Sequence, residues 1–289
     1  GSSEDIRLAD QVQGINVILS GHNHQPLKPA FHGNTLVAEG EIWSEKLGRI
    51  DLKWTKEKFD RPMIMESKLL PLEPVEPKGE LKKVLDHVYE QVGKKLEEKL
   101  ATIETPWKRN NRGESNIGGF FADGLKTWAK CDCAFLNSGG IRANHEGPDV
   151  TLGTVLEIFP FDNSTVTFEL SGADLWKACE KNATAQVTNE YGVLQVGGVA
   201  YEWKRNGKKA EVLNVTVNGE PLDKEKKYRC ASLDFVAVDQ SEKYLGDVKV
   251  QNVEHLHVTM SKVAEEWVRE QGKKGPIKAA LDGRMAEQK

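Results

Sequence analysis

Three prolines in one short segment constrain this chain more than any other feature. The segment LLPLEPVEPKGE (residues 69–80) contains Pro71, Pro74 and Pro77. Each proline lacks a backbone N–H and fixes its own φ, so we expect neither a helix nor a strand to run through the segment. With 289 residues the chain is long enough for two modest domains. We therefore predict three parts, which are residues 1–68, a linker at 69–104, and 105–289.

A long helix is expected directly after the prolines. From Glu80 to Leu100, apolar residues recur at spacings of three and four, with charged residues between them. The apolar positions are Leu81, Val84, Leu85, Val88, Val92, Leu96 and Leu100. This pattern is typical of an amphipathic helix of about six turns, with its apolar face packed and its charged face in solvent.

Helical and strand patterns alternate from residue 105 onward. Helices are predicted at 116–130 with Asn116 as the cap, 151–159, 172–185 and 258–271. Strands are predicted at 133–137, 164–171 and 228–237, together with a hairpin that turns at Asn206-Gly207 and a second turn at Asn218-Gly219. The mixture predicts an α/β or α+β domain of mixed sheets and helices.

Composition excludes several classes of function. The formal net charge is −4 and the pI is near 6.1, so the chain has no basic field for a nucleic-acid polymer. No apolar run approaches the roughly 20 residues of a membrane span. Cys131, Cys133, Cys179 and Cys230 are too few and too scattered for a disulfide framework, so we expect buried free thiols. In an oxidising compartment one pair could form a bridge, but the sequence does not select it.

The first candidate site is the stretch NVILSGHNHQP (residues 16–26). The apolar run at 15–19 is rich in β-branched residues and predicts a strand buried on both faces, which ends in a loop at Ser20-Gly21. His22 and His24 follow at a spacing that can hold one metal ion or two adjacent ions. Ordinary polar loop histidines are the alternative. A two-metal site needs several more ligands, and Asp5 and Asp10 are the only candidates before Ile15.

The second candidate site is FLNSGGIRANHEG (residues 135–147). A strand is expected to end at Asn137, and Gly139 and Gly140 allow a backbone to approach a ligand closely. Arg142 adds a permanently charged fork of donors, which suits a small anionic or polyhydroxyl molecule. Taken by themselves, the two glycines are explained more simply by a tight turn without a ligand.

Several motifs in one order resemble a known family. The motifs RGESNIGGFFADGL (112–125), NSGGIR (137–142) and FPFDN (159–163) are similar to the C-terminal domain of the 5'-nucleotidase family. That family includes bacterial UDP-sugar hydrolases and animal ecto-5'-nucleotidases. The stretch SGHNHQP is similar to the last metal motif of the family's N-terminal metallophosphoesterase domain. The resemblance implies a 5'-nucleotidase C-terminal domain, preceded by the end of a metallophosphoesterase β-sandwich and a long connecting helix.

The resemblance also implies a metal-dependent activity. His22 and His24 would be the last two ligands of a dinuclear site that holds divalent ions, with Zn, Mn and Mg all left open. In such sites a metal-bound hydroxide attacks phosphorus in line. The remaining ligands and the catalytic histidine have no counterpart in these 289 residues, so we expect this chain to be inactive alone. Family members are typically secreted, periplasmic or on the cell surface; the compartment and the oligomeric state of this protein stay open.

The expected ligand is a nucleotide or nucleoside. By motif matching, Asn137, Gly139, Gly140 and Arg142 would face the phosphate or ribose, and Asn163 would belong to the same site. Phe161 and Phe235 would stack on the two faces of the base, although each phenylalanine taken singly is more often a core residue. Arg112 lies near a family arginine that meets the phosphate, with Arg109 as a competitor.

One departure from the family puts ribose recognition in doubt. Many members follow the second phenylalanine with Gly-Gly-Asp, whose carboxylate accepts the ribose hydroxyls, but this chain reads FVAVDQSEKY from residue 235. Ser241 stands at the aspartate position, and Asp239 and Glu242 flank it. Asp239 is therefore a candidate substitute acceptor. Nucleoside monophosphates are the leading substrates; 2',3'-cyclic nucleotides, UDP-sugars, dinucleotides and a non-catalytic nucleoside-binding module are the alternatives.

Overall fold

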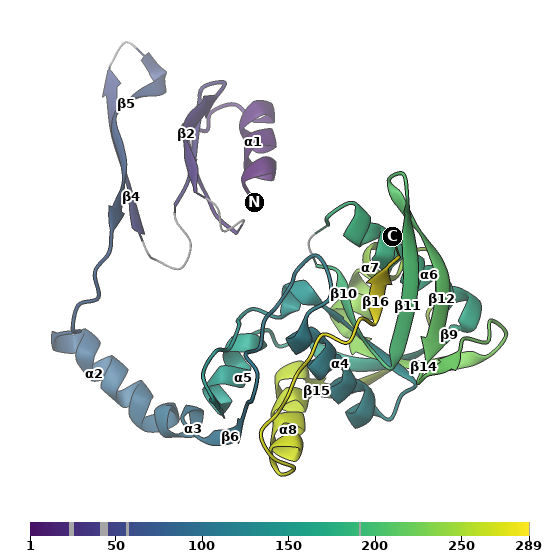
Figure 1. Ribbon diagram of the computed structural model, residues 1–289. Coiled ribbons are helices and arrows are strands. Elements are labelled where there is room, and N and C mark those ends of the chain that lie inside the picture. Colours follow the sequence, from purple (N-terminus) through teal and green to yellow (C-terminus); the bar gives the residue numbers. More distant parts are fainter. Residues whose placement is uncertain (23–25, 41–45, 56–57, 191, 289) are drawn as a thin grey trace. The chain divides into compact units, whose positions relative to one another are not determined.

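The computed structural model describes residues 1–22, 26–40, 46–55, 58–190 and 192–288. The chain divides into two compact units, Gly1–Lys83 and Val84–Lys289, and each is described here by itself (Figure 1). Within the described ranges, every helix is too short or too polar to span a lipid bilayer.

The first unit is built mainly from strands. Its helix α1 spans Ser2–Gln11, and its strands are β1 Val17–Ser20, β2 Leu27–His32, β3 Thr35–Glu39, β4 Lys46–Thr55 and β5 Lys58–Pro71. Strands β1, β3 and β2 form one sheet in that order, and β4 pairs with β5 as a separate hairpin. The central strand β3 is buried throughout. In β1, Leu19 is 77% exposed and the other three residues are only partly buried, so the expectation of a strand buried on both faces is wrong.

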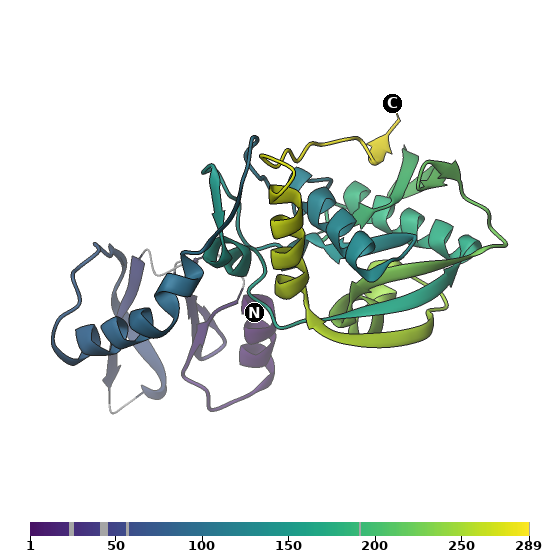
Figure 2. The same ribbon diagram turned by 90° about the horizontal axis from the view of Figure 1, so that it is seen from below.

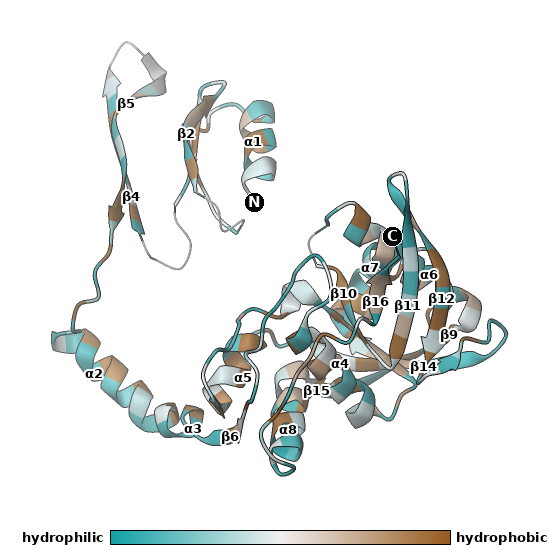
Figure 3. Cartoon of the chain, viewed as in Figure 1, coloured by the Kyte–Doolittle hydropathy of each residue, from teal (hydrophilic) through white to brown (hydrophobic). Residues whose placement is uncertain are grey.

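The proline segment is irregular, as predicted. Strand β5 ends at Pro71 and helix α2 begins at Gly79. Helix α2 (Gly79–Val88) continues through a π-helical turn, η2 (Tyr89–Gly93), into the short helix α3 (Lys94–Leu96). Figure 3 shows hydrophobic and hydrophilic residues on α2, but the side chains of its apolar face are exposed rather than packed. The helix ends at Leu96, before the predicted end at Leu100, because Lys99–Thr102 forms a strand.

The second unit is a mixed α/β domain. Its helices are α4 Asn116–Ala129, α5 Leu152–Ile158, α6 Gly172–Val187, α7 Ser241–Leu245 and α8 Met260–Gly272, with a 3₁₀ turn η3 Ser138–Gly140 and a π-helical turn η4 Phe235–Asp239. Its strands are β6 Lys99–Thr102, β7 Cys133–Asn137, β8 Asp149–Thr151, β9 Ser164–Ser171, β10 Leu194–Gly197, β11 Val199–Asn206, β12 Lys209–Val217, β13 Glu220–Pro221, β14 Lys227–Leu233, β15 Gln251–Thr259 and β16 Met285–Glu287.

A five-stranded sheet forms the centre of this domain. Its strand order is β10-β7-β14-β9-β15. Strand β7 runs parallel to β14, whereas β10 is antiparallel to β7, and β9 is antiparallel to both β14 and β15. A four-stranded sheet, β13-β12-β11-β16, contains the predicted hairpin at Asn206-Gly207. Helix α6 packs against β12 and β9, and α4 packs against β10, β7 and helix α8 (Figure 2).

Local sequence signals explain the start and the packing of helix α4. The helix is capped by Ser115, whose Oγ accepts a hydrogen bond from the N–H of Gly118 at 3.1 Å. Asn116, the predicted cap, is the first helical residue instead. Helix α4 also packs closely against β10. A Cβ added at Gly197 on β10 would lie 2.5 Å from the backbone oxygen of Ala122 on α4. Glycine at that position therefore lets β10 lie directly against the helix.

Candidate functional site

One edge of the five-stranded sheet gathers most of the predicted binding residues. Strands β7 and β14 are parallel, with Cys133 paired to Cys230, so their carboxyl ends lie at the same edge. Strand β9 is antiparallel to β14, and its amino end therefore lies there too. Asn137 ends β7, and the segments with Phe161 and Phe235 adjoin the ends of β9 and β14. Ligand sites commonly occupy the loops at such strand ends.

The segments with the two phenylalanines are joined directly. The N–H of Ser164 donates to Oδ2 of Asp234 at 3.3 Å, while Oδ1 of Asp234 accepts from the N–H of Phe235 at 2.8 Å. Phe161, three residues before Ser164, is 48% exposed, so the core-residue interpretation is wrong for it. Phe235 is partly buried and its ring lies 5.9 Å from that of Tyr244. Among the described residues, these two phenylalanine rings make no direct stacking contact with each other.

The loop after β7 brings an unsatisfied amide to this edge. Asn137 is buried, and its Oδ1 has no hydrogen-bond partner among the described residues. A Cβ at Gly140 would lie 3.1 Å from that oxygen, so glycine permits the tight approach of the loop. Ser138 fixes the loop through its N–H, which donates to the carbonyl of Val193 at 3.0 Å. Buried polar groups are normally paired, so the oxygen of Asn137 is a ready acceptor for a ligand or a water molecule.

Arg142 lies beside Phe161. Its guanidinium carbon is 5.7 Å from the centre of the Phe161 ring, within the range of a cation–π contact. Its Nη1 donates to the carbonyl of Gly139 at 3.1 Å, and its backbone N–H donates to the carbonyl of Ile158 at 2.9 Å. The arginine is thus held between the glycine loop and the segment that carries Phe161.

The two competing arginines have different surroundings. Nη1 of Arg109 donates to the carbonyls of Ile141 at 3.1 Å and Arg142 at 2.8 Å. Arg109 therefore clamps the glycine loop. Arg112 is exposed, and its guanidinium has neither a hydrogen bond nor an ion pair with any residue that the structure describes. Of the pair, Arg112 has the guanidinium that is available to an anion.

Asn111 is a residue that the sequence reasoning missed. Its Oδ1 is a second amide oxygen without a partner in the described part of the chain. Its carbonyl accepts hydrogen bonds from Oγ of Ser138 at 3.1 Å and from the N–H of Gly192 at 2.8 Å. These contacts connect positions 27 and 81 residues apart, so no local pattern signals them. Only its place beside Arg112 in the first family motif could have drawn attention to it.

Strand β14 ends earlier than predicted. The strand stops at Leu233 instead of 237, because Asp234 caps Phe235 and the chain turns into η4. The N–H of Gln240 donates to the carbonyl of Phe235 at 3.0 Å and closes this turn. Asp239 is exposed at the end of η4, and Ser241 begins α7.

Asn163 is partly buried, and its carbonyl accepts from the N–H of Met260 at 3.3 Å.

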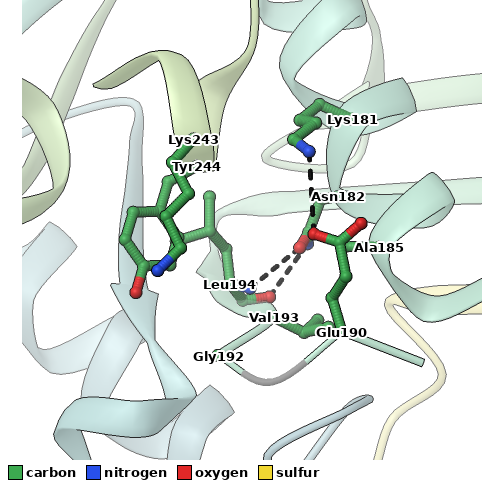
Figure 4. Close-up of a pocket in the computed structure, with 9 residues that line it drawn as sticks. All are labelled: Lys181, Asn182, Ala185, Glu190, Gly192, Val193, Leu194, Lys243 and Tyr244. Carbon is green, nitrogen blue, oxygen red and sulfur yellow. Dashed lines mark hydrogen bonds and ion pairs between the residues drawn. The ribbon is translucent and has the colours of Figure 1, made fainter. Parts of the chain in front are cut away.

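A small pocket adjoins Tyr244 (Figure 4). It is lined by Lys181, Asn182, Ala185, Glu190, Gly192, Val193, Leu194, Lys243 and Tyr244. The side chain of Asn182 accepts from the N–H of Leu194 at 2.8 Å and donates to its carbonyl at 2.9 Å, as a neighbouring strand would. Nζ of Lys181 lies 3.7 Å from a carboxylate oxygen of Glu190. Because the Tyr244 ring also lies 5.9 Å from the Phe235 ring, the pocket adjoins the segment that carries Phe235.

Glu114 connects the loop that carries Arg112 to the C-terminal segment of the chain. Its Oε1 accepts from the N–H groups of Asp282 at 3.3 Å and Gly283 at 3.2 Å. Burial, followed by the hydrogen bond and negative charge of Asp282, raises the pKa of Glu114 above its ordinary value. The pKa of Asp282 is lowered, chiefly by its hydrogen bond with Arg284. A proton is thus retained more readily by Glu114 than by Asp282.

The proposed metal ligands are only partly described. His22 is exposed just beyond β1 with a φ of 76°, and His24 lies outside the described residues. Asp5 accepts a hydrogen bond from Oγ of Ser20 at 2.7 Å. Across the described ranges, no group of three or more His, Cys, Asp or Glu side chains could hold a metal ion. The donor set described here therefore does not fit a two-metal centre.

A family model decides the relationship of the chain. The model of the 5'-nucleotidase C-terminal domain matches residues 92–244. The chain belongs to the 5'-nucleotidase family. This confirms the resemblance seen in the sequence motifs, and the mixed α/β architecture agrees with it.

Curated relatives extend the likeness. The chain is 28% identical to the trifunctional nucleotide phosphoesterase protein YfkN of Bacillus subtilis, over 99% of this chain and 21% of that protein. It is 24% identical to protein UshA of Yersinia enterocolitica, over 82% of this chain and 44% of that protein. A snake venom 5'-nucleotidase of Crotalus adamanteus is 22% identical over 99% of this chain and 55% of that protein. The chain thus spans about a fifth to just over half the length of these relatives.

Solved structures show the same fold. A 5'-nucleotidase precursor of Thermus thermophilus superposes with a TM-score of 0.75 at 22% identity, covering 98% of this chain and 61% of that chain. The NAD nucleotidase of Haemophilus influenzae gives a TM-score of 0.55 at 17% identity, covering 94% of this chain and 62% of that chain. Family members are nucleotide phosphoesterases, and the particular substrate of this chain is a separate question.

Proposed function

We propose that residues 105–289 bind the nucleotide substrate of a metal-dependent 5'-nucleotidase, and that nucleoside monophosphates are that substrate. The observation that carries the proposal is the gathering of Phe161, Arg142 and Phe235 at one sheet edge. An exposed aromatic ring, a partly exposed ring and a fixed guanidinium suit a ligand with both a flat base and an anionic group.

Each group has a role in this proposal. Phe161 and Phe235 stack on the base, and each stacking contact contributes about 1–3 kcal/mol without regard to base identity. Arg112 and Arg142 hold the phosphate through charge-assisted hydrogen bonds. The buried oxygen of Asn137 accepts a hydrogen bond from the ligand. Arg109 acts indirectly, by holding the backbone of the loop that presents Arg142.

Hydrolysis requires groups beyond those described. In the proposal, residues 1–68 are the end of a metallophosphoesterase domain, and 69–104 are its linker. His22 and His24 would belong to the coordination of divalent ions, but the described donors do not complete such a site. We therefore expect no phosphate release from AMP when this chain is mixed with Mn²⁺, Zn²⁺ or Mg²⁺. Release above a protein-free blank would overturn the assignment of this chain as a binding part only.

Titration calorimetry with adenosine, AMP and inorganic phosphate tests the binding function. We expect adenosine to bind through stacking, and AMP to bind more tightly because the arginines also contact its phosphate. A chain that binds neither adenosine nor AMP at millimolar concentrations would contradict the proposal. If phosphate binds as tightly as AMP, the stacking role is wrong, even though an anion site is present.

A different nucleotide class is the second candidate. Ser241 stands where many family members have the ribose-binding aspartate, and a hydroxyl is a weaker acceptor than a carboxylate. This favours a ligand whose sugar hydroxyls are modified, such as a 2',3'-cyclic nucleotide, or one with further contacts, such as a UDP-sugar. Competition of these ligands against AMP ranks the classes. If a protein that contains this chain binds all of these ligands and hydrolyses none of them, it is a nucleoside-binding module.

A further inference from the structure

The four cysteines occupy distinct environments in the second unit. Cys133 and Cys230 are fully buried on β7 and β14, and Cys179 is buried on helix α6. Cys131 precedes β7 and is only partly buried. The sequence left open which two could form a bridge, and the geometry of the sheet now distinguishes among them.

Cys133 and Cys230 are direct neighbours in the central sheet. They are paired residues on adjacent parallel strands, and their Sγ atoms lie 3.2 Å apart. Adjacent strands lie roughly 4.7–4.9 Å apart, and a disulfide requires Cα atoms about 4.4–6.8 Å apart. A small rotation of the two side chains is therefore enough to bring the sulfur atoms to bonding distance. No other contact between two cysteine sulfur atoms occurs in the described chain.

We propose that Cys133 and Cys230 are a cross-linking site, which forms a disulfide when the chain folds in the presence of a small-molecule disulfide oxidant. One protein thiolate attacks the oxidant disulfide, forms a mixed disulfide and releases one small thiol. The second protein thiolate then attacks the mixed disulfide and releases the other small thiol. Two protein thiols lose two electrons and two protons, and one oxidant disulfide becomes two thiols.

Burial controls when this reaction proceeds. Desolvation raises the pKa of Cys230 well above the ordinary thiol value, and neither Cys133 nor Cys230 is accessible to solvent. The attacking species is the thiolate, so the folded dithiol reacts slowly. The bond therefore forms during folding, before the sheet is closed. Cys131 is more accessible, although burial raises its pKa to about 11, and it serves as the internal comparison.

The bond would join the two strands that lead to the candidate ligand site. Strand β7 ends at Asn137, and β14 leads into Phe235. The bond would also close a loop across 97 positions of sequence, which restricts the unfolded chain strongly. Disulfides over long loops stabilise enough to raise the melting temperature of a domain of this size by roughly 5–15 °C.

Oxidative refolding tests the proposal. The 289-residue chain is unfolded in guanidinium with reductant and refolded either in reduced glutathione alone or in mixed oxidised and reduced glutathione. Free thiols are then alkylated in denaturant, and the digest is analysed by mass spectrometry. We expect a cross-linked peptide pair with Cys133 and Cys230 only after oxidative refolding, and a higher melting temperature for that sample. Protein kept folded in the same mixture should form the bond far more slowly.

Matched variants identify the partner, because a tryptic peptide of residues 131–142 contains both Cys131 and Cys133. Cys131→Ser should leave the cross-link intact, and Cys133→Ser should abolish it. The proposal is overturned if the oxidised wild type refolds to its native circular dichroism without this bond. It is equally overturned if Cys133→Ser retains a cross-link to Cys230, since Cys131 would then be the partner.

Discussion

The guanidinium of Arg142 lies 5.7 Å from the ring centre of Phe161. The residue proposed to hold an anion and the residue proposed to stack on a base are therefore neighbours, from segments that meet at the end of β7 and the start of β9. An arginine in this position orders the exposed ring as well as offering charge. The proposed anion binding by Arg142 and the proposed base stacking by Phe161 are therefore coupled through this contact.

Replacing Arg142 by lysine separates its charge from its shape. Arg142→Lys keeps the positive charge, but it loses the planar fork that donates to Gly139 and lies over the ring. We expect both adenosine and AMP to bind about 5–30-fold more weakly, because ordering of Phe161 is lost for both ligands. Titration calorimetry measures the effect. If only AMP binding weakens, the fork of Arg142 contacts the phosphate without ordering Phe161, and if neither ligand binds more weakly, its charge alone is sufficient.

Arg109 and Arg112 make a matched pair. Arg112→Ala removes an exposed guanidinium, so we expect an unchanged melting temperature, unchanged adenosine binding and AMP binding about 10-fold weaker. Arg109→Ala removes two hydrogen bonds to loop carbonyls, and we expect it to lower the free energy of unfolding by about 1–3 kcal/mol. Binding of both ligands should fall with it. The reverse pattern in urea denaturation and calorimetry would exchange the two roles.

Two phenylalanines two residues apart separate binding from stability. Phe161 is exposed, so Phe161→Ala should change the free energy of unfolding by less than about 1 kcal/mol while weakening nucleoside binding by about 1–3 kcal/mol. Phe159 is buried, with its ring 4.9 Å from Phe121, and Phe159→Ala should destabilise by about 3–5 kcal/mol. Equal binding by Phe161→Ala and wild type would remove Phe161 from the site.

Asp234 connects the segments that carry the two rings. Asp234→Ala loses the acceptors for the N–H groups of Ser164 and Phe235, and we expect a destabilisation of about 1–2 kcal/mol. Asp234→Asn retains one acceptor oxygen of the two and should lose about half as much. Adenosine binding should follow the same order. The connection between the segments is unimportant if the alanine variant binds adenosine as wild type does.

The Glu114 contact predicts a dependence of stability on pH. Because burial and Asp282 raise its pKa in the folded state, folding is favoured while Glu114 is protonated. This contribution is complete below the unfolded pKa near 4.5 and is lost as the pH rises through the higher folded value. Asp282 acts in the opposite sense, and its contribution is lost as the pH falls through its lowered pKa.

Glu114→Gln isolates the first of these two effects. Glutamine retains an oxygen for the N–H groups of Asp282 and Gly283 but does not ionise. We expect the melting temperature of the variant, relative to wild type, to rise between pH 4 and pH 7. Parallel melting profiles of the two proteins over this range would show that the Glu114 proton is not linked to folding.

Local patterns predicted most regular elements of the second unit. Helix α4, strand β9 and helix α6 fall close to their predicted ranges, because periodicity and capping residues are encoded within each segment. The cap of α4 was displaced by one residue. Ser115 and Asn116 are both good caps, but Asn116 instead accepts from the N–H of Lys108 at 2.8 Å, a contact that local sequence does not indicate.

Elements defined by their neighbours were harder to predict. Strand β15 is rich in polar residues and pairs irregularly with β9, so no alternating pattern revealed it. The end of β14 at Leu233 depends on Asp234 reaching both Phe235 and Ser164, whereas the apolar run continues beyond it.

In the candidate site, family motifs indicated Asn137 and Arg142. The clamping role of Arg109 depends on contacts 32 and 33 residues away, which periodicity cannot report.

The parallel pairing of β7 with β14 has a consequence for how this domain acquires its binding edge. The two strands meet across 97 positions of sequence, and β14, which follows β9 in the chain, must be inserted between β7 and β9 before the edge exists. Contacts of such long range form slowly, because chain entropy opposes them until many are made together. A nascent chain that has been synthesised only as far as α6 therefore contains Phe161 but lacks Phe235, which follows β14. Nucleoside can therefore stabilise this domain only after β14 has been synthesised.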